Sequence, residues 1–318
     1  MIAGEEREES RRSESLNSQL ERGRRRIWPQ VSSYGLLLVL SIIWGLAFVA
    51  IRGVVMELSP INLTLLRWFI ASIGFLVIFP FIGKPKVKFE RKDLPRLLTI
   101  ALLTVPSYHL SLNFAETTVS SGVAGLLMSL HPVFIAVLSA YLLREKIGGK
   151  LVLAVCLGIA GVIVLSLPNL DWGSNGSITG PLEVLLASLS FAVFSVLSKP
   201  LVHKYGSAPV TIWSSLAGTV MLLPLFSLGF VSEVAELSLT GWFAILYLSL
   251  LSTVVAYLLF YTLVSRGAVS KLSIQLYLIP VVSVVGGVLL LQEALSVYTI
   301  AGGAILLFSI SLATMNRK

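Results

Sequence analysis

Charged residues are scarce in this chain. Of its 318 residues only 13% are Asp, Glu, Lys or Arg, whereas about 25% is typical of globular proteins. Hydrophobic residues make up 56% of the sequence. This composition excludes an ordinary soluble domain and indicates a membrane protein.

Cysteine, long loops and the common enzyme motifs are also lacking. The single Cys156 excludes a disulfide within the chain and a cysteine-rich metal cluster. There is no Gly-rich phosphate loop, no His-Glu-x-x-His, no Gly-x-Ser-x-Gly and no pair of intramembrane aspartates, and the three histidines are scattered. The longest connections, 83–95 and 168–179, leave no room for a soluble catalytic domain. We therefore expect no enzyme, and so no catalytic residue, metal or cofactor.

Long hydrophobic stretches are present instead. Windows of about 20 apolar residues are long enough to cross a bilayer as a helix. The predicted spans are 34–56, 60–82, 96–114, 119–143, 148–167, 180–200, 208–230, 240–264, 271–291 and 296–314. The predicted fold is an all-α membrane protein with ten transmembrane helices. Residues 1–30 form a charged tail too poor in apolar residues to bury a core, which we expect to be disordered.

Lysine and arginine are distributed asymmetrically along these spans. If each stretch crosses once, 22 of the 24 Lys and Arg residues lie on one side of the membrane. The positive-inside rule then places both termini in the cytoplasm, as in a multi-pass protein of the cytoplasmic membrane. The basic residues are thus topology signals, and nucleic acid is not an expected partner. Arg52 and Arg67 are the two exceptions, and Arg52 is expected to snorkel outward from the end of the first span.

The chain repeats itself at an offset of 148 residues. Pro132 falls on Pro280 and Glu145 on Glu293, with similar flanking residues. The repeats are 34–167 and 180–314. Each contains five spans, and because five is odd the second copy enters the membrane in the opposite sense. Inverted five-helix repeats are typical of secondary transporters, in which alternating access exposes a site between the halves.

Short motifs within these repeats resemble a known family. They are Trp44-Gly45, Ser59-Pro60 followed by Leu66-Arg67-Trp68, Pro132 followed by Glu145, and Pro280 followed by Glu293. In this order they are similar to the drug/metabolite transporter superfamily, specifically its EamA-type members with ten helices, over nearly all of 34–314. The resemblance implies export or import of small metabolites, such as amino acids, through a central cavity.

Pro132 and Pro280 lie close to the middle of the fourth and ninth spans. Proline lacks the backbone donor and clashes with the carbonyl four residues earlier, which frees the carbonyls of Met128 and Leu276. In hydrocarbon such groups should face protein, water or substrate. A paired gating or cavity role and a simple packing kink both fit this pattern.

Polar and aromatic residues within the spans are candidate cavity walls. The repeat pairs His109 with Tyr257, Asn113 with Tyr261 and Ser129 with Tyr277, and residues four apart share a helix face. The candidate substrate-binding residues are Trp44, His109, Asn113, Ser129, His131, Tyr257, Tyr261, Gln275 and Tyr277. The alternative for the tyrosines is a place at the membrane interface or between helices with satisfied hydroxyls.

Four charged residues remain to be explained. Arg67 lies well inside the second span, where it needs a partner: a substrate carboxylate, helix carbonyls, or Glu116 or Glu183. We favour a structural role for Arg67. Glu183 is a candidate for proton coupling, together with His109 and His131. Glu145 and Glu293, at span ends, are expected to cap helices or to pair at the gates.

These features predict a carrier of small metabolites, with the substrate and the bilayer as partners. Cavity candidates rich in aromatic rings and hydroxyls favour amino acids or related amphipathic compounds, with export as the expected direction. A coupling proton and a counter-substrate both stay open. The alternatives are a nucleotide-sugar or other organic-anion exchanger, which needs more basic groups, and a channel, which an inverted repeat suits less well.

Overall fold

The computed structural model describes residues 33–82, 87–142, 148–169, 178–265 and 275–314, and these are helical with no strand. The tail predicted over 1–30 lies outside them. The helices of the first half are α2 (Ser33–Val54), α3 (Pro60–Ile82), η1 (Arg91–Asp93), α4 (Leu94–Leu102), η2 (Leu103–Ser107), α5 (Tyr108–Ala115), α6 (Ser121–Met128), α7 (His131–Leu142), α8 (Gly149–Ser166) and η3 (Leu167–Asn169).

The second half follows the same plan. Its helices are α9 (Thr179–Tyr205), α10 (Ser207–Leu222), η4 (Leu223–Leu225), α11 (Gly229–Ala235), α12 (Leu239–Leu246), η5 (Tyr247–Val255), α13 (Ala256–Ser265), α14 (Gln275–Leu291) and α15 (Val297–Thr314).

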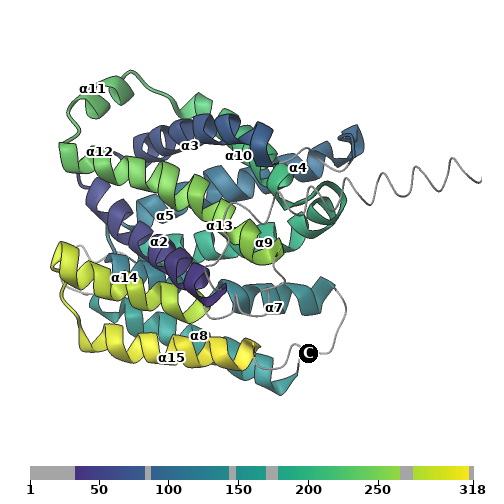
Figure 1. Ribbon diagram of the computed structural model, residues 1–318. Helices are drawn as coiled ribbons and strands as arrows, with labels where there is room; N and C mark the ends of the chain where they lie inside the picture. The colour runs from purple at the N-terminus through teal and green to yellow at the C-terminus, as the bar shows by residue number, and fades with distance from the viewer. Residues whose placement is uncertain (1–32, 83–86, 143–147, 170–177, 266–274, 315–318) are drawn as a thin grey trace, which may run out of the picture.

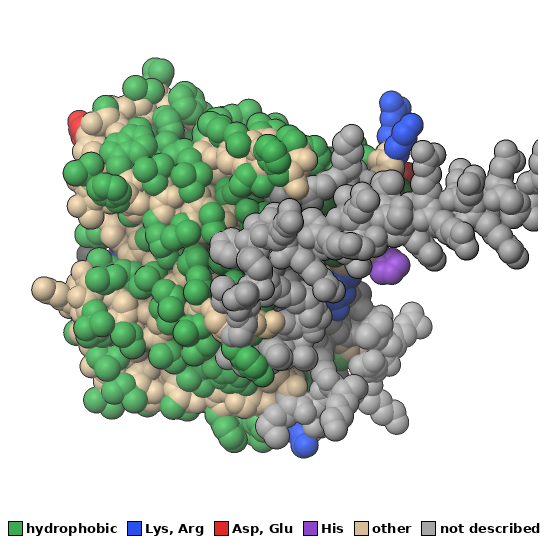
Figure 2. All heavy atoms as spheres, viewed as in Figure 1, with side chains coloured by type: hydrophobic (Ala, Val, Ile, Leu, Met, Phe, Trp, Pro, Cys, Tyr) green, Lys and Arg blue, Asp and Glu red, His purple; other side chains and the backbone are tan. Residues whose placement is uncertain are grey.

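The predicted all-α membrane fold is confirmed. Among the described residues, nine helical segments are long and apolar enough to cross a membrane, and the shorter apolar α14 supplies the tenth. Apolar side chains also cover much of the face that Figure 2 shows. An exposed aliphatic surface of this extent is stable only against lipid.

One predicted span is wrong in its bounds. The window 208–230 holds two helices, because α10 ends at Leu222 and α11 is a separate short helix. Pro224 lies in the intervening 3-10 turn η4. A proline has no N–H with which to continue the helical hydrogen bonds, so the chain turns at this point.

The two halves interlock rather than sit side by side. α2 and α6 of the first half pack on α14 of the second, and α8 packs on α15. In turn α9 packs on α5 and α7, and α10 on α3 and α4. Figure 1 shows α8 and α15 together along one edge of the bundle, with α3 and α10 at the opposite edge. Groups near the centre are therefore shared by both repeats.

Two π-helical segments occupy matching places in the repeats. η2 (Leu103–Ser107) lies inside the third span and η5 (Tyr247–Val255) inside the eighth. At the offset of 148 residues, η2 falls within η5. π-helical turns are uncommon and concentrate at functional sites, because the extra residue re-aims the side chains that follow. Here those side chains include His109 and Tyr257.

The ends of the bundle differ in charge. One end, which we call the acidic end, carries Glu57, Glu116, Glu233 and Glu293 at or between the ends of spans. The other, the basic end, carries most of the described Lys and Arg residues. Figure 2 shows blue side chains at the right of the view and a red one at the left.

Gly45 lets α2 approach α14 closely. A Cβ at this position would lie 2.5 Å from Val282 Cβ and 2.9 Å from the backbone oxygen of Ile279. At Gly53, two turns further along α2, the nearest atom to an added Cβ would be Leu291 Cδ2 at 4.0 Å. Gly45 and Gly53 are therefore a test position and its control for alanine substitution in the same helix.

We expect Gly45→Ala to destabilise the protein by about 1–3 kcal/mol, because the overpacked helices must separate. Gly53→Ala should instead stabilise it by up to ~1 kcal/mol through the helix propensity of alanine. Denaturant unfolding of each purified variant in detergent measures the two changes in the free energy of unfolding. Equal stability of the two variants would contradict the packing described here.

Candidate functional site

The fourth span is broken where the sequence predicts it. α6 ends at Met128 and α7 begins at His131, so that Pro132 lies in the first turn of α7. The freed Met128 carbonyl accepts hydrogen bonds from Ser188 Oγ at 3.3 Å and from the His131 ring, whose Nδ1 lies at 3.0 Å. The carbonyl thus faces protein, as expected, and it joins α6 to α9.

Pro280 behaves differently. It lies inside the continuous helix α14, where it is buried. Its neighbour Ile279 presents a carbonyl to Gly45 of α2. The ninth span is therefore kept whole by close packing on α2, whereas the fourth is discontinuous. Whether either proline gates the site stays a proposal.

Arg67 is buried, with 5% of its surface exposed. One terminal nitrogen donates to Thr253 Oγ1 at 3.2 Å, and Nε has no hydrogen-bond partner. Within the described residues no carboxylate lies within ion-pair distance of Arg67, so the alternative in which Arg67 pairs with Glu116 or Glu183 is not formed.

A polar seam runs between α3 and α5, formed by Arg67, Trp68, His109, Asn113 and Glu116. Asn113 Nδ2 donates to Thr64 Oγ1 at 2.8 Å, and the His109 and Trp68 rings lie 4.9 Å apart. Every seam residue has a buried side-chain atom with no partner in the described structure. These atoms are Arg67 Nε, Trp68 Nε1, His109 Nδ1, Asn113 Oδ1, Glu116 Oε1 and Glu116 Oε2. Such a concentration is unusual, because buried polar groups are normally hydrogen-bonded.

Trp44 and Tyr257 lie together on the second-half side of Arg67. Their ring centroids are 6.5 Å apart, and Trp44 Nε1 donates to the Ser252 carbonyl at 3.2 Å. Phe75 and Phe260 extend this aromatic group. The structure thus joins His109 and Asn113 to Trp68 and Thr64 of α3, and Trp44 to Tyr257, which lies against Phe75 of α3.

The remaining predicted residues lie elsewhere or are not described. Ser129 Oγ bonds back to the Leu126 carbonyl of its own helix. Tyr277 turns to α15, with its hydroxyl 3.3 Å from Ser311 Oγ and 3.4 Å from Thr314 Oγ1. This matches the alternative of a tyrosine between helices. Glu145 lies outside the described residues, as do the side chains of Tyr261 and Gln275.

Glu293 caps a helix across the repeat. Its carboxylate accepts from Ser121 N and Ser121 Oγ, both at 2.8 Å, and from Gly122 N at 3.4 Å. These donors form the first turn of α6, where free N–H groups and the helix dipole favour an anion. The predicted helix-capping role is therefore what the geometry shows. Glu57 acts similarly, since Ser238 N and Oγ donate to it at 2.9 Å ahead of α12.

Arg52 reaches the C-terminal end of the third span. Its guanidinium donates to the backbone carbonyl of Glu116 at the end of α5. An unpaired helix-terminal carbonyl offers this charged donor a partner. The hydrogen bonds of Glu57 and Glu293 join elements of both halves at the acidic end, and the Arg52 contact joins α2 to the end of α5 there.

Glu183 and the basic end complete the charged groups. Glu183, on α9, is partly exposed. At the basic end, Lys204 lies 2.6 Å from Glu90 and 2.7 Å from Asp93, which ties the end of α9 to the chain before α4. The ammonium groups of Lys204 and Lys92 hold the pKa of Glu90 below its ordinary value. No group of three or more metal ligands occurs among the described residues.

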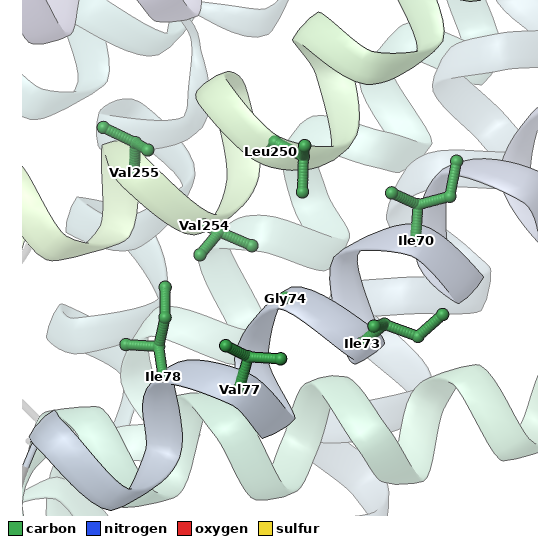
Figure 3. Close-up of a pocket in the computed structure, with 8 residues that line it drawn as sticks. All are labelled: Ile70, Ile73, Gly74, Val77, Ile78, Leu250, Val254 and Val255. Atoms are coloured by element: carbon green, nitrogen blue, oxygen red, sulfur yellow. The ribbon is translucent and has the colours of Figure 1, made fainter.

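Two surface grooves are unsuited to a polar substrate. The groove of Figure 3, about 410 Å³, is lined only by apolar residues and glycine from α3 and η5: Ile70, Ile73, Gly74, Val77, Ile78, Leu250, Val254 and Val255. A second groove of about 410 Å³ between α2 and α14 is equally apolar. Neither offers a hydrogen bond, so both suit lipid chains better than the metabolite.

Sequence reasoning missed two features of this site. Thr253 acquires its contact with Arg67 through a π-helical turn, which leaves no pattern in the sequence. Glu116 was considered only as a partner for Arg67, although it stands three residues after Asn113, at the end of the same helix. That spacing is the signal that places it on the face of the seam.

A duplicated five-helix membrane fold that encloses a buried polar site is typical of a membrane transporter. The family model of the EamA-like transporter family matches residues 31–167 and again 178–315. The chain therefore belongs to the EamA-like transporter family.

Curated relatives agree with this assignment. An "Uncharacterized transporter" of Archaeoglobus fulgidus is 35% identical over 86% of this chain and 95% of its own length. A "Probable terminal-alkyne amino-acid exporter" of Streptantibioticus cattleyicolor is 28% identical over 88% and 92%. A "Probable amino-acid metabolite efflux pump" of Escherichia coli is 27% identical over 86% and 91%.

A solved structure shares the fold. The chain described as "Crystal structure of protein" superposes with a TM-score of 0.59 at 19% identity, over 88% of this chain and 95% of that one. At this identity the likeness supports the arrangement of helices alone.

Proposed function

We propose that this protein exports amino acids or closely related amphipathic metabolites by alternating access, with the substrate carboxylate bound at Arg67. The observation that carries the proposal is a buried guanidinium with an unpartnered Nε and no carboxylate at ion-pair distance in the described residues. An unpaired buried cation is strongly unfavourable. A bound carboxylate would complete it through bidentate hydrogen bonds.

The surroundings of Arg67 suit the rest of such a substrate. Trp44 and Tyr257 supply an apolar aromatic surface on one side, and Asn113 Oδ1 supplies an unpaired acceptor for an ammonium group on the other. Two of the relatives are named as exporters of amino acids or their metabolites. One basic group is too few for a nucleotide sugar, whose phosphates attract several cations.

The acidic end is proposed to face outward. Twenty-two of the 24 Lys and Arg residues lie in segments that share the opposite side, which the positive-inside rule assigns to the cytoplasm. Both termini are then cytoplasmic and the membrane is the cytoplasmic one. The hydrogen bonds of Glu57, Glu293 and Arg52 join the acidic end, so this conformation is closed to the outside.

Efflux from preloaded liposomes tests the proposal. The purified protein is reconstituted, and release of labelled phenylalanine, tyrosine, threonine, cysteine and a nucleotide sugar is followed against empty liposomes. We expect at least one amino acid to leave several-fold faster and the nucleotide sugar to be retained. Selective release of the nucleotide sugar would support the exchanger, and a voltage-driven current without substrate selectivity would support a channel.

A further inference from the structure

Glu116 is the most isolated charged group of the acidic end. It follows Ala115, the last residue of the third span, and none of its surface is exposed. Neither carboxylate oxygen has a hydrogen-bond partner in the described structure. Its own backbone carbonyl, by contrast, holds the guanidinium of Arg52. The guanidinium at this site thus hydrogen-bonds the peptide carbonyl rather than the carboxylate.

Each packed element contributes its titratable or charged groups to this environment. They are Arg52 on α2, Arg67 on α3, Tyr108 and His109 on α5, Glu183 on α9 and Glu293 after α14, while α6 carries none. Burial raises the pKa of the Glu116 carboxyl well above its ordinary value, and Glu293 acts in the same direction, whereas Arg52 and Arg67 act against it. A carboxyl group in this setting is stable when it is protonated and neutral.

Three other candidates for proton binding have partners or lie in more open surroundings, whereas His109 is buried with an unpartnered Nδ1. Glu293 accepts three hydrogen bonds from the first turn of α6. The ring of His131 contacts the Met128 carbonyl. Glu183 is partly exposed, so water can solvate its charge. Glu116 therefore differs from the other carboxylates at this end in being both buried and unpartnered.

We propose that Glu116 is a proton-binding site whose protonation closes the acidic end. When this end opens, water reaches the carboxyl, which releases its proton, and the guanidinium of Arg52 moves from the Glu116 carbonyl to the carboxylate. Closure reverses these steps: Glu116 takes up one proton and Arg52 returns to the carbonyl. The proposal rests on the alternating access proposed above, and it couples one external proton to each closure.

The sign of the pH dependence follows from this linkage. The closed state binds one more proton than the open state, so low pH favours closure and rising pH favours opening. For a single proton, the ratio of open to closed protein changes by at most about tenfold per pH unit.

Thiol accessibility measures the opening without any substrate. Val119 is 2% exposed and lies three residues after Glu116. In the full-length Cys156→Ala, Val119→Cys protein, the rate of labelling by a water-soluble maleimide reports opening. The same protein carrying Glu116→Gln, which mimics the neutral carboxyl, is the matched control. Dividing the two rates at each pH cancels the ordinary pH dependence of thiol reactivity.

We expect the ratio of these rates to rise about tenfold or more between about pH 6 and about pH 8. A ratio that does not change with pH would overturn the proposal, because the titrating group would then be Glu293, Glu183, His109 or none. Failure of the transport assay leaves this measurement intact, so the two proposals fail separately.

Arg52→Gln provides a second variant in case Glu116→Gln does not fold. Without the cation that stabilises the open carboxylate, the opening transition should move upward by about one pH unit. An unchanged transition in Arg52→Gln would contradict the exchange of partners.

Discussion

Replacing Arg67 by methionine is expected to lower transport of a carboxylate-bearing substrate by about 10- to 100-fold. Hydrogen bonds to a charged partner contribute about 1.5–3 kcal/mol, which corresponds to this range. The folded yield should change little, because an apolar residue of similar length often replaces a buried charge without loss of stability. The transport rate of Arg67→Lys should lie between those of the wild type and Arg67→Met, since lysine keeps the charge but not the bidentate geometry.

The amide of the best substrate lacks the carboxylate charge. Its transport therefore distinguishes substrate binding by Arg67 from a purely structural role of Arg67. The wild-type protein should prefer the free amino acid to its amide, and Arg67→Met should move both at similar rates, measured in the same liposomes. If Arg67 only holds α3 to η5 through Thr253, the variant will lose stability and transport together while the preference for the free acid persists. That outcome would return Arg67 to the structural role favoured by its sequence context.

Removal of the Glu293 carboxylate is expected to open the acidic end. Glu293→Ala leaves the N–H groups of Ser121 and Gly122 without their acceptor, in a first turn whose dipole favours an anion. A lost cap and a buried unsatisfied donor together cost about 2–3 kcal/mol. The closed state should therefore become about 30- to 150-fold less populated relative to the open state.

Maleimide labelling at Val119→Cys, in the Cys156→Ala protein, measures this change directly. The control is Glu236→Ala, which removes an exposed carboxylate from the same end of the bundle. We expect labelling to accelerate only in the Glu293 variant. Equal rates in both variants would show that the hydrogen bonds at α6 do not hold the acidic end closed.

Much of the fold follows from the sequence for a simple reason. Hydrocarbon forces every spanning segment to be an apolar helix, so hydropathy locates the ten spans, and the offset of Pro132 and Pro280 reveals the repeat. The break at Pro132 follows from the missing backbone N–H of proline, which leaves one helical hydrogen bond unmade. Pro280 shows that a proline can also lie inside a continuous helix, α14, when neighbouring helices pack closely.

The site was less predictable because it depends on which helices meet. His109 and Asn113 share a face, as their spacing indicates, but only the packing of α3 on α5 shows that this face meets Trp68 and Thr64. The π-helical turns that direct Thr253 to Arg67 arise from tertiary packing rather than from local preference. Arg52 shows the same limit, since its partner is a backbone carbonyl that carries no sequence signal.

Trans-stimulation in liposomes tests the central claim, alternating access through a single site, most directly. Labelled substrate is placed outside, and its entry is measured with and without the same unlabelled amino acid inside. For a carrier that alternates around one site, entry of the labelled substrate should be several-fold faster when unlabelled amino acid is present inside. The internal amide should stimulate entry less than the free acid. Entry that ignores the internal amino acid would show an open pathway and would contradict this account.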